Sequence, residues 1–246
     1  MPDTRLIYIQ GNIEKFAKNI AGKKTLILGS GPSAREIDWE SSDWECLLTT
    51  SFFYLNEDVI RQKPCHVSLS KIIDIENQKL HEYLDLNPNC TVSFEPKIEK
   101  YIGKSFDANC QVPLNVLKHA HSFYRSQAFE NFFKKYADRM FFYRCLGGLE
   151  GLAGRLCWLT LNYRPSNISI CGIDGVSLNR NNDPQNYFRN HAGTMDDYTY
   201  EDYLTSFEDF AEKLYQSSNN LGVTVNNLGK GKSYNMLTRI SKKYEK

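Results

Sequence analysis

Short apolar runs alternate with longer amphipathic stretches along the chain, and each run is long enough for one β-strand. Nearly continuous apolar strands bounded by glycine or polar residues are typical of a sheet that is buried on both faces. The runs that predict strands are 25–28, 45–50, 66–69, 90–94, 140–143, 168–174 and 222–226.

Helical patterns lie between these runs, so that strand and helix alternate. We expect helices over 6–22, 34–38, 77–84, 122–138, 149–161 and 200–216. Alternation of this kind indicates parallel strands joined by right-handed crossovers. The predicted fold class is therefore α/β: a Rossmann-like, mostly parallel sheet with helices on both faces.

Residues 175–197 break the pattern, because they are polar, rich in Asn, Asp, Arg and Gly, and without sustained periodicity. A long loop of this type inside a compact domain is usually functional or mobile. We find no internal repeat, low-complexity linker or second-domain boundary. The sequence thus predicts a single Rossmann-like domain over 1–246 that carries a flexible polar lid at about 175–197.

Charge and hydropathy exclude several classes of protein. With 30 Lys and Arg against 29 Asp and Glu, the chain lacks the basic excess that nucleic-acid binding usually requires. No apolar run approaches the roughly 20 residues that span a bilayer.

The mixed, charged segment 1–24 does not resemble a secretory signal, so we expect a cytoplasmic protein. For the basic segment 239–246, a solvated helix end is favoured over peripheral contact with anionic lipid.

Seven cysteines occur without a Cys-x-x-Cys pair or histidines at zinc spacing. We therefore expect most of them to be small buried apolar residues, and we predict no metal site. His119 and His121 are two positions apart and cannot share a helix face.

The first candidate for chemistry is the loop Gly29-Ser30-Gly31-Pro32-Ser33, which joins an apolar strand to a helical pattern. Glycines permit close backbone approach, and N–H groups at a helix start can bind a phosphate. Ser33 is placed to cap that helix, with Glu36 completing a capping box. A purely structural turn is the alternative interpretation.

Two further candidates lie later in the chain. Gly172 and Asp174 end a strand at the edge where open α/β sheets bind ligands, and Asp174 could hold a ribose, a sugar hydroxyl or a metal, or simply cap a turn. His191 lies in the polar loop and titrates near neutral pH, which suits a general base, although a loop histidine is often merely solvated. Arg189 offers a fixed cation for a phosphate or carboxylate.

Taken together, these motifs resemble one group of bacterial sialyltransferases, which pair a single Rossmann-like domain with a flexible lid. The resemblance rests on Gly29-Ser-Gly-Pro-Ser33 with Glu36-Ile-Asp38, on Ser51-Phe-Phe-Tyr54, on Gly172-Ile-Asp174, and on the polar loop with its histidine. Ser30 and Thr50 stand where that group typically has asparagine. The same skeleton also resembles the domain family related to 6-hydroxymethylpterin diphosphokinase.

The sialyltransferase resemblance implies a role for each matched position. Gly29, Ser30, Gly31, Pro32 and Ser33 would form the loop that contacts the phosphate or ribose of a CMP-sugar. Thr50 and Ser51 would face this donor, and Gly172 and Asp174 would line the nucleotide pocket.

For catalysis, the resemblance implies that His191 deprotonates the acceptor hydroxyl while Arg189 and Tyr187 stabilise the departing phosphate. The implied enzyme is a glycosyltransferase of glycan biosynthesis that transfers sialic acid or a related nonulosonic acid. Its partners would be a nucleotide-sugar donor and a glycan acceptor, and it would need no cofactor.

Two alternatives stay open: an Mg²⁺-dependent diphosphotransferase of the pterin kinase kind, and a non-catalytic nucleotide-binding module. The abundant aromatic residues are explained mainly by the core, with sugar stacking or contacts in a homo-oligomer as the other interpretations.

Overall fold

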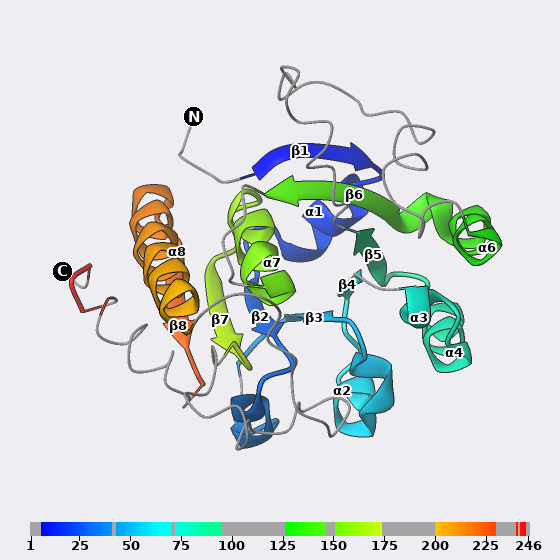
Figure 1. Cartoon of the computed structure of the whole chain (residues 1–246), viewed down its shortest axis with the longest axis horizontal. Helices are drawn as coiled ribbons and strands as arrows, with labels where there is room; N and C mark the ends of the chain where they lie inside the picture. The colour runs from blue at the N-terminus through cyan, green and yellow to red at the C-terminus, as the bar shows by residue number, and fades with distance from the viewer. Residues whose placement is uncertain are drawn as a thin grey trace.

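One sheet of eight strands runs through the protein, in the order β1-β6-β5-β4-β3-β2-β7-β8 (Figure 1). The computed structural model describes residues 6–40, 43–69, 72–94, 126–145, 151–173, 200–229, 240 and 242–244. The strands are β1 (Leu6–Gly11), β2 (Lys24–Leu28), β3 (Cys46–Thr50), β4 (His66–Leu69), β5 (Thr91–Phe94), β6 (Met140–Cys145), β7 (Asn167–Cys171) and β8 (Thr224–Asn227). All neighbouring pairs are parallel except β1 with β6. The α/β, Rossmann-like, mostly parallel fold is therefore confirmed.

The predicted helix over 6–22 is wrong in its first part. Residues Leu6–Gly11 form β1, which pairs antiparallel with β6, and the helix α1 begins only at Glu14 and ends at Ile20. Leu6-Ile7-Tyr8-Ile9 is rich in β-branched and aromatic residues, which favour strands wherever a sheet edge offers a partner. The partner strand lies far away in the sequence, so the local pattern alone did not show this pairing.

Helices cover both faces of the sheet, as the sequence predicts. On one face lie α1, α7 (Gly151–Leu161) and α8 (Tyr200–Leu221), whose apolar side chains form one buried cluster with the strands. On the other face lie α2 (Glu57–Arg61), α3 (Ile72–Ile75), α4 (Gln78–Leu86) and α6 (Gln127–Tyr136), which form the second cluster.

The central strand β2 explains why the predicted strands are continuously apolar. Leu26 and Leu28 belong to one buried cluster, whereas Ile27, between them, belongs to the other. Because successive side chains of a strand point to opposite faces, a strand with helices on both sides needs an apolar residue at every position.

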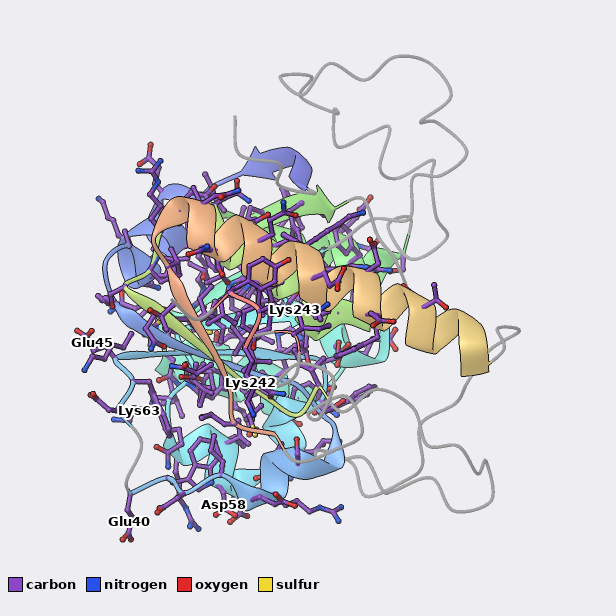
Figure 2. All side chains as sticks on the ribbon, turned by 90° about the vertical axis from the view of Figure 1, so that its left-hand side faces the viewer. Glu40, Glu45, Asp58, Lys63, Lys242 and Lys243 are labelled. Atoms are coloured by element: carbon purple, nitrogen blue, oxygen red, sulfur yellow. A yellow bond between two sulfur atoms is a disulfide. The ribbon has the colours of Figure 1, made fainter. Side chains whose placement is uncertain are left out.

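The described residues of the C-terminal segment pack against α8. Ile240 is buried, the Lys243 Nζ donates to Glu212 Oε1 at 2.7 Å, and Tyr244 stacks on Tyr215. Figure 2 looks onto α8 and labels Lys242 and Lys243. Among the helices in the described part of the chain, none is both long and apolar enough to cross a membrane.

The cysteines follow the prediction only in part. Cys90, Cys157 and Cys171 are buried thiols, as expected. Cys46 and Cys65, however, form a disulfide that joins the start of β3 to the residue before β4. The spacing of these two cysteines carries no motif, so their pairing follows from the sheet, which places β3 beside β4.

A buried histidine lies in the face of the sheet covered by α1 and α7. His66 has no exposed surface; its Nδ1 lies 2.8 Å from Thr91 Oγ1 and its Nε2 3.0 Å from Ser93 Oγ. The Thr91 hydroxyl donates to the Cys65 carbonyl, so the His66 Nδ1–H donates to Thr91 and the Nε2 accepts from Ser93. The neutral ring is thus satisfied, and burial lowers the pKa of His66 to about 3.

Acid should therefore destabilise the protein through His66. Below pH 6.5 the unfolded chain takes up a proton that the folded chain does not, so the free energy of unfolding should fall by about 1.4 kcal/mol per pH unit towards pH 3. Denaturant titrations from pH 7 to pH 4.5 should show a shallower fall in His66→Gln than in wild type. His81→Gln, at a partly exposed histidine of α4, is the control. Equal slopes in wild type and His66→Gln would refute the prediction.

Candidate functional site

The strand order defines a switch point between β2 and β7. After β2 the chain adds β3, β4, β5 and β6 on one side, and it then places β7 on the other side of β2, followed by β8. In open α/β sheets, ligands bind outside the carboxyl ends of the strands at the point where the order reverses. The loops after β2 and β7 are two of the predicted binding segments, so they lie at the expected place.

Gly29 and Gly172 bring these two loops into direct backbone contact. A Cβ built on either glycine would collide with the carbonyl oxygen of the other, and a Cβ on Gly172 would also lie 3.0 Å from the Cβ of Ala34. Gly172 has φ +72°, in the left-handed region. Two glycines are therefore required here, because no side chain fits between the two strand ends.

Ser33 connects the two loops through hydrogen bonds. The prediction that it caps a helix is wrong. Its hydroxyl oxygen accepts a hydrogen bond from the Gly172 N–H at 3.1 Å, and its carbonyl accepts from the Cys171 thiol at 3.4 Å. The short helix η1 (Pro32–Glu36) has Gly31 as its N-cap, with no capping side chain. The capping box was inferred from local spacing, whereas the partner that Ser33 bonds is 139 positions away.

The loop differs from the expected phosphate cradle in a second respect. The segment after β2 is a short 3₁₀-helix over Pro32–Glu36, whereas we expected a helix over 34–38. The Gly29 N–H donates to the Cys171 carbonyl and the Gly31 N–H to the Gly172 carbonyl, both at 2.8 Å. These two amides hold the loops together, so a bound phosphate would need other donors.

Thr50 and Ser51 lie at the carboxyl end of β3, beside the β2 loop. Both side chains are buried, at 5% and 7% exposure. Thr49 pairs with Leu28 in the sheet, and its hydroxyl donates to the Leu28 carbonyl at 3.3 Å. The structure thus brings Thr50, Ser51, Gly29 and Gly172 to one edge of the sheet.

Asp74 lies at this same edge and was missed from the sequence. It belongs to α3, directly after β4, and its fully buried carboxylate accepts from the Phe52 N–H and the Tyr54 hydroxyl. The sequence did offer one signal for Asp74: it is an acidic residue inside the apolar run Ile72-Ile-Asp-Ile75, just after a predicted strand.

The remaining predicted residues, Asp174, Tyr187, Arg189 and His191, lie outside the described residues, as does the proposed lid at 175–197. Their predicted roles stay predictions. Within the part of the chain that the structure describes, no three histidine, cysteine or acidic side chains come together as a metal site.

Comparison with known proteins yields one distant structural similarity. No protein-family model matches the chain, and no curated protein matches it. A solved structure of the sialyltransferase CstII from Campylobacter jejuni, in complex with the substrate analogue CMP-3FNeuAc, is similar with a TM-score of 0.46 and 14% sequence identity. The similarity covers 87% of this chain and 85% of that one. The fold assignment rests on the strand order described above.

Proposed function

We propose that the chain is a glycosyltransferase that moves a sugar from a CMP-activated donor to a hydroxyl of a glycan acceptor. The observation that supports this function is the contact of the Gly29–Ser33 loop with Gly172 at the switch point, through a hydrogen bond and close backbone packing. These segments are the two most specific parts of the sialyltransferase resemblance, and they are 139 positions apart yet bonded to each other. The sugar we propose is sialic acid or a related nonulosonic acid.

In the proposed reaction the acceptor oxygen attacks the anomeric carbon of the donor sugar. The bond from that carbon to the phosphate oxygen breaks, and CMP leaves with the electron pair. His191 takes the proton of the acceptor hydroxyl, and Arg189 and Tyr187 stabilise the charge that develops on the phosphate. Closure of residues 175–197 would keep water, the competing acceptor, away from the donor.

The loops after β2 and β7 are held in place by hydrogen bonds to each other and would form one rigid side of this site. The amides of Gly29 and Gly31 are engaged within the protein, so we propose that Arg189 and Tyr187, and not these amides, hold the phosphate. Ser33 then acts through Gly172, by holding the start of the segment that continues to Asp174. A loop that is already ordered before the ligand arrives binds more tightly, because ordering a loop on binding costs affinity.

A thermal-shift screen tests the proposal. A ligand that binds only the folded state stabilises it by about 2.7 kcal/mol at 100 times its Kd, which for a chain of this size raises the melting temperature by about 5–10 °C. We expect this rise with CMP, in the presence of EDTA as well as of Mg²⁺. The panel should also contain CDP, UDP, GDP, ADP and ATP.

The other outcomes of the screen separate the alternatives. A shift by ATP that requires Mg²⁺ would replace our proposal with a diphosphotransferase. Binding of CMP without any transfer or hydrolysis of a CMP-sugar would indicate a non-catalytic nucleotide-binding module. No shift with any nucleotide would contradict all three functions.

A further inference from the structure

The turn after β3 holds a bulky residue in a backbone conformation that side chains rarely adopt. Phe52 has φ +71°, and it is the N-cap of the short helix η2 (Phe53–Leu55). In this left-handed region the Cβ crowds the following carbonyl oxygen, so a bulky residue stays there only where its surroundings hold it. Strained residues of this kind are enriched at functional sites. Phe52 directly follows Thr50 and Ser51, which are candidate site residues.

Asp74 supplies the contacts that hold this turn. Its Oδ1 accepts from the Phe52 N–H at 3.2 Å and from the Tyr54 hydroxyl at 2.8 Å. The carboxylate has no exposed surface, and Tyr54 is 1% exposed. One buried oxygen therefore fixes both the strained residue and the aromatic ring two positions later.

The turn lies between two neighbouring strand ends. Asp74 comes from α3, which follows β4, whereas Phe52 and Tyr54 follow β3, the strand between β4 and β2. Thr49 is level with Leu28 in the sheet, so Thr50, the last residue of β3, and Ser51, which follows it, lie beside the Gly29–Ser33 loop. A shift of the turn after β3 would carry these two hydroxyl groups with it.

We propose that Asp74 is a positioning residue of the nucleotide site, which sets Thr50 and Ser51 against the bound donor by holding Phe52 and Tyr54. The inference rests on the proposed function, since it assumes that a nucleotide binds at this edge. Asp74 acts through the backbone of the turn and does not itself touch the donor.

Three variants and one control test the proposal. Asp74→Ala removes both contacts, and Tyr54→Phe removes one of them in a chain whose packing is otherwise kept. Asp74→Asn retains Oδ1 as an acceptor for both donors. Tyr83→Phe is the matched control, because Tyr83 is a buried tyrosine of the same core whose hydroxyl donates elsewhere, to the Pro64 carbonyl at 2.7 Å.

Calorimetric titration with CMP is the first measurement. We expect Tyr54→Phe and Asp74→Ala to raise the Kd about tenfold, the lower end of the loss found when residues that orient metal ligands are replaced. Asp74→Asn should stay close to wild type, and Tyr83→Phe should bind CMP unchanged even if it is equally destabilised. An unchanged Kd in Tyr54→Phe, or an equal rise in Tyr83→Phe, would overturn the proposal.

Amide hydrogen exchange of residues 50–54, without nucleotide, separates this proposal from the proposed function. We expect faster exchange there in Tyr54→Phe than in Tyr83→Phe. If that difference is found but wild type binds no CMP, the proposed function fails while Asp74 is upheld as the residue that orders the turn. If wild type binds CMP and exchange in both variants is the same, Asp74 has no positioning role.

Discussion

Replacing Gly172 by alanine is expected to lower the free energy of unfolding by about 2–5 kcal/mol. A side chain at φ +72° costs about 1–2 kcal/mol by itself. The new Cβ would also collide with the Gly29 carbonyl and lie 3.0 Å from the Ala34 Cβ, and overpacking of this kind costs about 1–3 kcal/mol more. Backbone atoms cannot rotate out of the way as a side chain does.

Gly22→Ala is the matched control for this substitution. Gly22 has φ +69°, but nothing lies within 4 Å of the place where its Cβ would be. It should therefore show only the conformational cost, about 1–2 kcal/mol. Urea denaturation of both variants measures the difference. Equal losses would show that the contact between the two strand ends is looser than the structure has it.

Replacing His191 by alanine is expected to reduce the rate of sugar transfer by a factor of about 10²–10⁴, which is the usual contribution of a positioned general base. The Kd for CMP should remain at the wild-type value, because the proposed role of His191 concerns the acceptor proton and not the nucleotide. The loss should appear in kcat, measured as CMP release from a CMP-activated nonulosonic acid in the presence of acceptor.

His119→Ala serves as the control, since it removes another histidine for which we propose no chemistry. A rate within a few-fold of wild type is expected for it. Should His191→Ala keep its activity while Arg189→Ala loses it, the general base must be sought elsewhere in the chain, although the glycosyltransferase proposal would stand.

Most of the sheet could be predicted from the sequence, because its strands carry their own signal. A short apolar run that ends at a glycine, such as Thr25-Leu-Ile-Leu28, is typical of a strand covered on both faces. β1 was missed because its apolar residues Leu6-Ile-Tyr-Ile9 also suited the start of a helix, and only the distant neighbour β6 decides that Leu6–Gly11 is a strand. The pairing of Cys46 with Cys65 was hidden for the same reason.

The candidate site was predictable in its location but not in its contacts. The glycine loop and Gly172 were identified as ligand loops because both follow apolar strands, and the sheet does bring them together. Local spacing gave Ser33 a capping role, whereas its hydroxyl in fact bonds Gly172. Asp74 gave only a weak signal, since its meaning depends on Phe52 and Tyr54, which belong to a different connection.

The neighbouring position of β2 and β7 also sets the order in which the molecule can be built during translation. β2 can pair with β3, and then β4 with β5, while the chain is still emerging, but the Ser33 contact with Gly172 spans 139 positions. At about 5–20 residues per second, the ribosome would deliver β7 many seconds after β2. A nascent chain would thus carry one exposed edge of β2 for that whole interval, so the strand that completes the candidate site would also be the one that protects the unfinished sheet from aggregation.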